Sequence, residues 1–225
     1  MSNRDRQKRA AAEAAVAEID QGMLVGIGTG TTVAFAIAAL GERVRRGWAI
    51  RAVATSVASE QAARKVGIAI EDFSTLAHVD LAIDGIDEID PAFRAIKGAG
   101  GALLREKVVA SAAKRMIAIG DASKPVVQLG NAPVPLEVLP FAQSFVAARI
   151  EALGGTPVVR GSYRTDQGNP IVDCSFGLIG DPPGLAVQLS AIPGVLGHGL
   201  FLHEIDELYI GRGDRVSHTE RPARG

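Results

Sequence analysis

Short apolar runs alternate with helical patterns through the first 124 residues of the chain. The runs lie at 23–30, 49–56, 79–85 and 115–124, and each contains or is followed by Gly, Thr, Ser or Asp. The segments between them space apolar residues three or four positions apart, as in a helix with one buried face. Strands that alternate with helices predict right-handed crossovers and a parallel sheet. Polar residues at the strand ends then gather along one edge, where α/β proteins bind ligands.

The pattern changes after Lys124, where several prolines indicate a domain boundary near residue 130. The segments that follow predict the β-α-β-β-α-β order of a ferredoxin-like domain. They are strands at 134–139, 156–161, 171–176 and 195–201, and helices at 144–155 and 183–192. A further strand at 206–214 is expected to return to the first domain. We therefore predict an α/β protein with a Rossmann-like parallel-sheet domain (1–129 plus 205–225) and a smaller ferredoxin-like α+β domain (130–204).

The first glycine turn, GIGTGTT at 26–32, lies between a predicted strand and a predicted helix. Thr31 stands where G-x-G-x-x-G has its third glycine, and no lysine follows as a P-loop requires. The next strand ends in Thr55 and Ser56, without an acid for a dinucleotide ribose. NAD and ATP are therefore disfavoured, whereas amides and hydroxyls at this turn suit a small phosphate or sugar. Taken alone, the motif is equally consistent with a tight strand-to-helix turn that has only a structural role.

Five carboxylates lie between residues 80 and 90. Their spacing does not match an EF-hand, so a metal site is disfavoured. Glu88 and Asp90 are typical of a solvated acidic turn. Asp84 follows a buried apolar run, and Asp84 and Asp87 are the stronger candidates for ligand contacts.

A second glycine run, Gly98 to Gly101, follows Lys97 and opens a predicted helix with Leu103, Leu104, Val108 and Ala112 facing inward. Helix starts behind glycines attract anions, because their free amides point outward. Lys97 and Glu106 flank this predicted anion pocket. Taken alone, a lysine at a strand end or a glutamate in REK more commonly faces water than takes part in a site.

Composition narrows the function further. The 225 residues include 24 basic and 25 acidic side chains, with a net charge of −1, which disfavours nucleic acid as a partner. The single cysteine, Cys174, lies among apolar neighbours and is expected to be a buried thiol in a reducing cytoplasm. The first 19 residues predict a helix, not a signal peptide, and no run is apolar enough to span a membrane.

Hydrolytic chemistry has no support in the sequence. His78, His198, His203 and His218 lack zinc-ligand spacing, and no Ser or Cys lies in a G-x-S-x-G elbow.

Several ordered motifs together resemble the ribose-5-phosphate isomerase A family over nearly the whole chain. They are VGIGTGTT (25–32), TSVAS (55–59), DGIDEID (84–90), KGAGGALLREK (97–107), GDASK (120–124), PLEVLP (135–140) and SAIPGVLGHGLF (190–201). The resemblance implies interconversion of D-ribose 5-phosphate and D-ribulose 5-phosphate in the non-oxidative pentose phosphate pathway, without metal or organic cofactor. It also implies a cytoplasmic homodimer or homotetramer with a sugar phosphate as its small-molecule partner.

The resemblance also assigns roles to residues. Glu106 matches the general base that moves a proton between C1 and C2 through a cis-enediolate, and Asp84 and Lys97 match residues that assist it. The implied substrate-binding residues are Lys8, Thr29, Gly30, Thr31, Thr32, Asp84, Gly85, Asp87, Lys97, Gly98, Ala99, Gly100 and Lys124. The family commonly has glycine where this chain has Ala99. A left-handed Ala99 costs about 1 to 2 kcal/mol, unless Gly101 lets the loop shift.

Two other functions remain open. A coenzyme A transferase also uses an α/β scaffold and can use a glutamate such as Glu106 as nucleophile. A non-catalytic sugar-phosphate sensor binds the ligand without turnover, although the near-neutral charge and the lack of a DNA-binding motif disfavour a regulatory protein of this kind.

Overall fold

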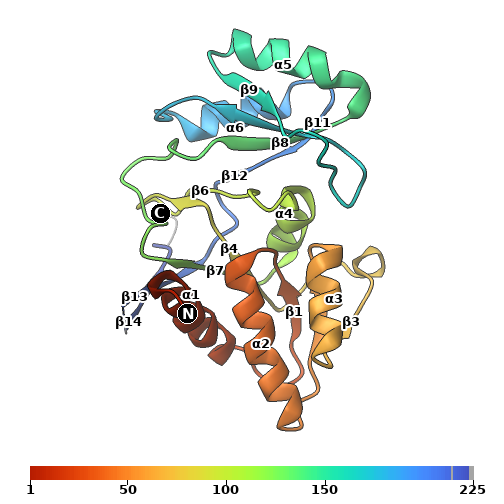
Figure 1. The fold of residues 1–225 in the computed structure, drawn as a ribbon, viewed down its shortest axis with the longest axis vertical. Helices are drawn as coiled ribbons and strands as arrows, with labels where there is room; N and C mark the ends of the chain where they lie inside the picture. The colour runs from red at the N-terminus through yellow and green to blue at the C-terminus, as the bar shows by residue number, and fades with distance from the viewer. Residues whose placement is uncertain (214, 223–225) are drawn as a thin grey trace. The chain divides into compact units, whose positions relative to one another are not determined.

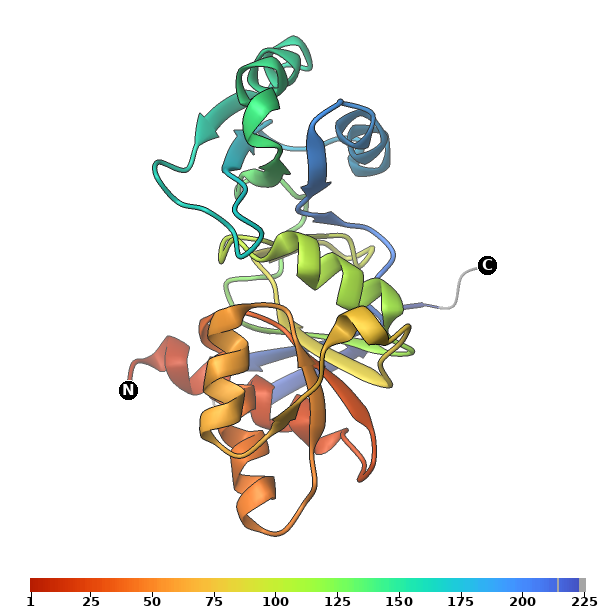
Figure 2. The same ribbon diagram turned by 90° about the vertical axis from the view of Figure 1, so that its right-hand side faces the viewer.

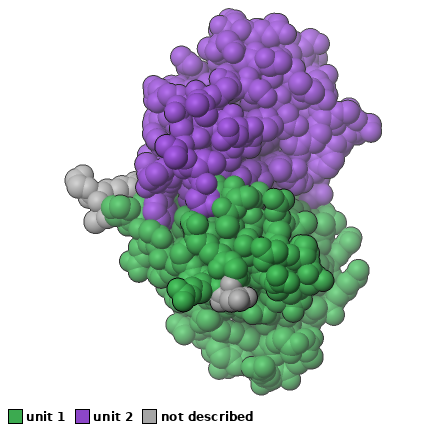
Figure 3. Space-filling view, turned by 60° about the vertical axis from the view of Figure 1, so that its left-hand side comes forward, with its two compact units in different colours: residues 1–85, 105–124, 204–225 green, residues 86–104, 125–203 purple. Residues whose placement is uncertain are grey.

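The computed structural model describes residues 1–213 and 215–222, and these divide into two compact units (Figures 1 and 3). The first unit contains residues 1–85, 105–124 and 204–225, and the second contains 86–104 and 125–203. Residues 86–104 are therefore counted with the second unit, whereas the predicted domain boundaries place them in the first. Asp214, the last residue of a predicted strand, lies outside the described residues, as do residues 223–225 of the predicted first domain.

A mostly parallel sheet forms the centre of the first unit. Its strand order over the described residues is β14-β13-β7-β4-β1-β2-β3, and only the edge pair of β13 and β14 is antiparallel. The strands are β1 (Leu24–Ile27), β2 (Arg51–Ala54), β3 (Ala69–Ile70), β4 (Leu81–Gly85), β7 (Met116–Asp121), β13 (Glu207–Arg212) and β14 (Arg215–Glu220). The four apolar runs predicted as strands are thus β1, β2, β4 and β7. This confirms the predicted Rossmann-like parallel sheet.

Helices α1 (Asn3–Ala17), α2 (Thr31–Arg45) and α3 (Val57–Lys65) share an apolar core with the strands of this sheet. Alternate strand residues such as Val25, Ile27 and Ile83 belong to this core, because successive side chains of a strand point to opposite faces. Figure 1 shows α2 and α3 beside each other within the unit. The N-terminal helix was predicted, and a capping box of Ser2 and Asp5 starts it.

Helix α4 (Leu103–Ala112) packs through its second half on the other face of the sheet. A Cβ on Gly26 would lie only 2.6 Å from Val109 Cγ1, so a glycine in β1 lets the helix approach closely. Val108, predicted to face inward, is instead 47% exposed, whereas Val109 and Ala110 are buried. The prediction was right for Leu103 but wrong for Val108, because the buried stripe continues from Leu103 through Glu106 to Val109 and Ala110.

The second unit has the predicted β-α-β-β-α-β order. Its antiparallel sheet has the strand order β11-β8-β10-β9 over the described residues. The elements are β8 (Val134–Val138), α5 (Gln143–Ala152), β9 (Thr156–Val159), β10 (Ile171–Ser175), α6 (Pro182–Ser190) and β11 (Val195–His198), with the short helix η2 (Pro140–Ala142) before α5. Figure 2 shows α5 and α6 on the same side of the sheet, where Leu136 and Val172 form the core with them. The ferredoxin-like prediction is confirmed.

A small sheet of β5 (Glu88–Ile89), β6 (Ala95–Ile96) and β12 (Leu200–Phe201) was not foreseen. The predicted strand at 195–201 in fact divides at Gly199 into β11 and β12. The Gly199 amide donates to Pro135 O at 2.8 Å, and its carbonyl accepts from Lys97 N at 2.9 Å. One apolar run therefore serves two sheets, and the second sheet holds the residue just before Lys97. The remaining short helix is η1 (Phe73–Thr75).

Candidate active site

The first glycine turn is fixed to the end of β4 by backbone amides. Gly28 N donates to Ile83 O at 2.9 Å, and Thr29 N donates to Asp84 Oδ1 at 3.0 Å. Gly85 N donates to the same Asp84 oxygen at 2.7 Å. A Cβ on Gly28 would lie 2.0 Å from the Asp84 carboxylate, so only glycine fits at this position. The turn and Asp84 therefore form one rigid arrangement within the first unit.

Buried hydroxyl groups support this turn from the next strand and helix. Thr29 Oγ1 lies 2.8 Å from Thr55 Oγ1 and donates to Ser56 Oγ at 2.9 Å. Ser59 Oγ donates to Gly28 O at 2.7 Å, and Ser56 caps α3 by accepting from Ser59 N. Thr55, Ser56 and Ser59 were not among the predicted site residues. Thr55 and Ser56 follow the end of β2, which is next to β1 in the sheet, and Ser59 lies in the first turn of α3; this position is the sequence signal that identifies them.

Basic side chains approach the amino end of α2 and the end of β7. Lys8 Nζ donates to Thr31 Oγ1 at 2.9 Å. Gly30, with φ +113°, precedes the first residue of α2 without a side-chain cap, and Thr32 is buried behind it. Lys124 is half-buried, and its amide donates to Asp121 O at 3.1 Å. Helix amides and ammonium groups of this kind attract phosphate.

The Asp121 carboxyl next to Lys124 is held in its charged form. Burial is the largest single influence and raises its pKa, but hydrogen bonds from the Ser123 hydroxyl and amide lower it. Lys124 and Arg4 act in the same direction, so the pKa of Asp121 lies below its ordinary value. The end of β7 therefore carries an anion that balances the basic side chains around it.

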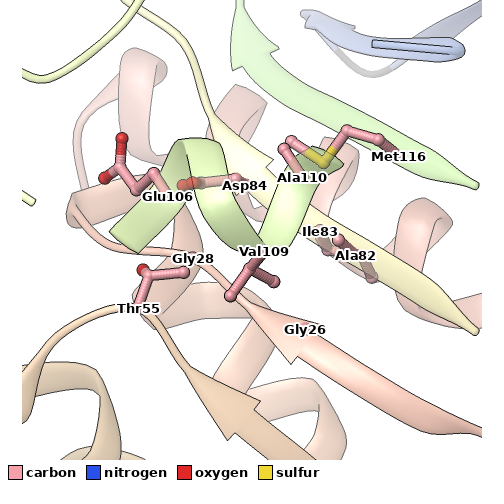
Figure 4. A pocket seen from close by; sticks show the side chains of 10 residues that line it. All are labelled: Gly26, Gly28, Thr55, Ala82, Ile83, Asp84, Glu106, Val109, Ala110 and Met116. Atoms are coloured by element: carbon pink, nitrogen blue, oxygen red, sulfur yellow. The ribbon is translucent and has the colours of Figure 1, made fainter. Parts of the chain in front are cut away.

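A pocket lies between the sheet and α4 in the first unit (Figure 4). It is lined by Gly26, Gly28, Thr55, Ala82, Ile83, Asp84, Glu106, Val109, Ala110 and Met116. Asp84 and Glu106 are each 3% exposed, and Figure 4 shows both carboxyl groups above Gly28 and Thr55. Glu106 lies three and four positions before Val109 and Ala110, so the same helix face that packs on the sheet carries this acid into the pocket.

Lys97 directly follows β6 in the second unit and is 2% exposed. Its Nζ lies 5.2 Å from the centroid of the Phe201 ring in β12, and its amide is bonded to Gly199. Ala99 N donates to Asp87 Oδ2 at 2.9 Å. An ammonium group over an aromatic face is favourable, and it limits the directions that the lysine chain can take.

In the second glycine loop, Gly98 to Gly101, the residues with positive φ are glycines. Gly98 has φ +107° and Gly101 has φ +79°, whereas Ala99 is not among the residues with positive φ. The possible strain at Ala99 is therefore absent, because Gly101 takes the left-handed conformation instead. Ala99 and Gly100 are exposed, and Gly98 is buried against Leu103 and Pro135.

The structure thus divides the predicted site residues into two sets, one in each unit. The first unit holds Lys8, Thr29, Gly30, Thr31, Thr32, Asp84, Gly85, Glu106 and Lys124. The second unit holds Asp87, Lys97, Gly98, Ala99 and Gly100.

Comparison with known proteins decides the family. The sequence profile described as Ribose 5-phosphate isomerase A (phosphoriboisomerase A) matches residues 51–215. A relative from Sphingopyxis alaskensis, named Ribose-5-phosphate isomerase A, is 51% identical over 98% of this chain and 99% of its own length. A relative of the same name from Methanosarcina acetivorans is 48% identical over 92% of this chain and 91% of its own.

The chain belongs to the ribose 5-phosphate isomerase A family.

Solved structures of this family share the fold. Ribose 5 phosphate isomerase A from Neisseria gonorrhoeae is similar with a TM-score of 0.92 and 37% identity, over 97% of both chains. A D-ribose-5-phosphate isomerase in complex with phospho-erythronic acid is similar with a TM-score of 0.93 and 34% identity, over 98% of this chain and 100% of that one. The family's enzymes are aldose-ketose isomerases, which confirms the resemblance stated from the sequence motifs.

Two acids of this protein, Glu88 and Asp90, were predicted to be solvated but have structural partners. Glu88 is buried and accepts from Gly130 N at 2.8 Å and Ala132 N at 2.6 Å. Asp90 is also buried and pairs with Arg94. The prediction of a solvated acidic turn was therefore wrong for both, because each carboxylate satisfies backbone amides of its own unit.

The structure also bears on the cysteine and on possible metal sites and membrane-spanning helices. Cys174 is fully buried, and burial raises the pKa of its thiol to about 12, as expected for an inert cysteine. Among residues 1–213 and 215–222, no cluster of His, Cys, Asp and Glu is placed to hold a metal ion. In the same ranges no helix has the length and apolar character needed to cross a membrane.

Proposed function

We propose that the protein interconverts D-ribose 5-phosphate and D-ribulose 5-phosphate, with Glu106 as the general base. The observation that carries the proposal is the placement of Glu106, almost fully buried and lining one pocket with Asp84 and Gly28, in a chain of this family. A carboxylate within reach of a carbon acid can remove its proton when most water is excluded. The apolar side chains that line the rest of the pocket provide this exclusion.

The proposed reaction moves one proton between neighbouring carbons. In the open-chain aldose, Glu106 removes the C2 proton and the electron pair forms a C1–C2 double bond, giving a cis-enediolate. The C1 carbonyl pair moves onto O1 in this first step. The carboxyl group of Glu106 then returns a proton to C1, while the proton of the O2 hydroxyl passes to O1 and the C2 carbonyl of the ketose forms. The negative charge that develops on oxygen needs a positive partner.

Lys97 is the proposed partner for this negative charge. Lys97 is 2% exposed, so its positive charge acts where most water is excluded and an electrostatic interaction with a developing oxyanion is strengthened. Contact with Phe201 restrains the side chain before the substrate arrives, which lowers the reorganisation needed during the reaction. We propose that amides of the loop from Gly98 to Gly100 assist Lys97; the Ala99 amide already donates to Asp87.

The proposed substrate contacts follow the chemistry of each group. Lys8, Lys124 and the amino end of α2 suit the phosphate, because they combine ammonium groups with helix amides. Asp84 and Asp87 suit sugar hydroxyls and ring opening, since carboxylates accept strong hydrogen bonds. Phosphate binding far from the reacting carbons holds the sugar while the proton moves.

The ligand of one relative agrees with this reaction. The isomerase of 34% identity was solved with phospho-erythronic acid. The carboxylate of that acid is planar and negatively charged, as is the reacting end of an enediolate. We therefore propose that this protein binds the same compound more tightly than ribose 5-phosphate.

Proton exchange at substrate C2 in deuterated water tests the proposal. We expect deuterium at C2 with ribose 5-phosphate, at an unchanged rate in the presence of a chelator, and far slower exchange with arabinose 5-phosphate. Binding without exchange would indicate the sensor instead of the enzyme. A thioester trapped on Glu106 would indicate the coenzyme A transferase, and loss of exchange with chelator would contradict a reaction without metal.

The assembly and cellular setting remain part of the proposal. From the family resemblance we propose a cytoplasmic homodimer or homotetramer that serves the non-oxidative pentose phosphate pathway. Sedimentation equilibrium of the full chain measures the subunit number directly.

A further inference from the structure

The carbonyl groups of the second glycine loop are held by side chains about sixty residues further along the chain. Arg160 Nη1 donates to Ala99 O at 3.0 Å and to Gly98 O at 3.4 Å. Tyr163 Oη donates to Gly100 O at 3.2 Å. Both side chains come from the connection between β9 and β10, and all these residues belong to the second unit. Each of the carbonyls from Gly98 to Gly100 therefore has a side-chain donor.

Arg160 is itself fixed in direction. Its Nε donates to Asp173 Oδ2 at 2.8 Å and its Nη2 donates to Asp173 Oδ1 at 2.5 Å, a bidentate pair with β10. Its guanidinium carbon lies 5.7 Å from the centroid of the Tyr163 ring. A bidentate pair sets the plane of the guanidinium group, so the remaining nitrogen points to the loop with little freedom.

Tyr163 packs where the loop has no side chain. A Cβ on Gly101 would lie 2.2 Å from the Tyr163 hydroxyl oxygen. Gly101 also has φ +79°, and its amide donates to Gly98 O at 2.9 Å to close the turn. The glycine at 101 thus serves both the backbone conformation and the close approach of the tyrosine.

Holding a carbonyl oxygen also orients the following amide, because the peptide group is planar and trans. The Gly98 carbonyl shares its plane with the Ala99 amide, which donates to Asp87 Oδ2. The Gly100 carbonyl shares its plane with the Gly101 amide, which donates to Gly98 O. The Ala99 carbonyl shares its plane with the amide of Gly100. That amide has no acceptor among the described residues, and Gly100 is exposed.

We propose that Arg160, anchored by Asp173 and stacked near Tyr163, is a positioning residue that aims the Gly100 amide at the developing negative charge of the substrate. The inference rests on the proposed function, because it specifies how the donor that assists Lys97 is oriented. Preorganised amides act on the transition state and on its analogues more than on the substrate. The arginine therefore affects kcat and analogue affinity, not substrate affinity.

The test compares Arg160→Met with the wild-type full chain. We expect kcat for ribose 5-phosphate to fall roughly 10- to 100-fold, because a small misplacement of a donor has an effect of this size. KM should stay within about threefold, and the affinity for phospho-erythronic acid should fall in parallel with kcat. Arg149→Met removes an exposed arginine of α5 in the same unit, and it should leave all three quantities unchanged.

Two further variants keep the test decisive if Arg160→Met does not fold. Arg160→Lys keeps the positive charge but lacks the planar fork that bonds Asp173 through two nitrogens and Ala99 O through a third, so kcat should still fall several-fold. Gly101→Ala should lower kcat because the added Cβ displaces Tyr163. Gly168 also has a positive φ, but nothing lies within 4 Å of a Cβ added there, so Gly168→Ala is the control and should leave kcat unchanged.

The outcomes separate the two proposals. If the wild type shows C2 exchange, and folded Arg160→Met and Arg160→Lys keep normal kcat and normal analogue affinity, the proposed role of Arg160 is overturned but the proposed function is not. A lower melting temperature with unchanged kcat would assign Arg160 to stability only and overturn it as well. Absence of C2 exchange in the wild type would overturn the proposed function, and this inference with it.

Discussion

The two glycine turns of this protein are held in different ways. The turn at Gly28 is fixed by Asp84 at the end of the neighbouring strand and by Ser59 in the next helix. The loop at Gly98 to Gly101 is fixed by Arg160 and Tyr163, which the sequence places about sixty residues away. The first turn is thus supported within consecutive βαβ units, whereas the second depends on another part of its unit.

This difference follows from where each turn lies in the fold. Parallel strands end at one edge of their sheet, so the fold brings Gly28 and Asp84 together without further aid. No such regularity places donors beside Ala99 O, and long polar side chains with an ion pair supply them. Substitutions should therefore affect the first turn through packing and the second through orientation.

The largest effect is expected from the acid that lines the pocket next to the first turn. Glu106→Gln keeps the shape of the side chain but cannot accept the C2 proton. Turnover of ribose 5-phosphate should fall about 100-fold to 10,000-fold, with binding of the sugar phosphate largely intact. Steady-state kinetics and calorimetric titration measure the two quantities. Near-normal turnover would show that another group removes the proton.

A steric substitution in the first turn is expected to come next. Gly28→Ala places a Cβ 2.0 Å from the Asp84 carboxylate, so Asp84 or the turn must move. We expect kcat to fall roughly 100-fold, as for a misplaced catalytic geometry. Gly180→Ala, where nothing lies within 4 Å of the added Cβ, is the matched control. Equal activity of the two variants would contradict the rigid arrangement described here.

Lys107, which follows Glu106 in α4, gives a prediction for stability against pH. Burial lowers the pKa of Lys107 to about 8, although Glu204 opposes the shift. Below about pH 8 the folded protein must bury a charged ammonium group, and this cost is relieved as the pH rises from about 8 to 10.5.

Lys107→Met should therefore stabilise the protein by up to about 3 kcal/mol near pH 7, with little gain near pH 10.5. Urea unfolding at both pH values measures the difference. Lys65→Met, at an exposed position of α3, serves as control. A gain that is independent of pH would point to packing instead of charge burial.

The smallest expected effect concerns one hydrogen bond that supports the first turn. Ser59→Ala removes the donor to Gly28 O and leaves that carbonyl without it. We expect a loss of about 1 to 2 kcal/mol in the free energy of unfolding and a decrease of kcat of only a few-fold. Ser111→Ala, exposed in α4, should change neither. A large loss of kcat for Ser59→Ala would show that the hydroxyl network acts in the reaction.

Much of the candidate site was predictable because its residues follow strands. Asp84 and the Gly28 turn were recognised from apolar runs that end in polar residues, and Glu106 from a helix that begins after glycines. The inward position of Val108 and the solvated position of Glu88 were predicted wrongly. Periodicity gives the spacing of a buried stripe but not its exact phase, and an acid's burial depends on which amides reach it.

The sequence by itself determined the alternation of strands and helices around β1, β2, β4 and β7, the β-α-β-β-α-β order of the smaller unit, the positions of the two glycine turns and the family, since each depends on local pattern or ordered motifs. Only the tertiary structure decided how Arg160 and Tyr163 meet Gly98 to Gly101 and how one apolar run divides between two sheets at Gly199. The physical reason is that a hydrogen bond between distant segments is set by the path of the whole chain. Local propensity and periodicity do not contain that path.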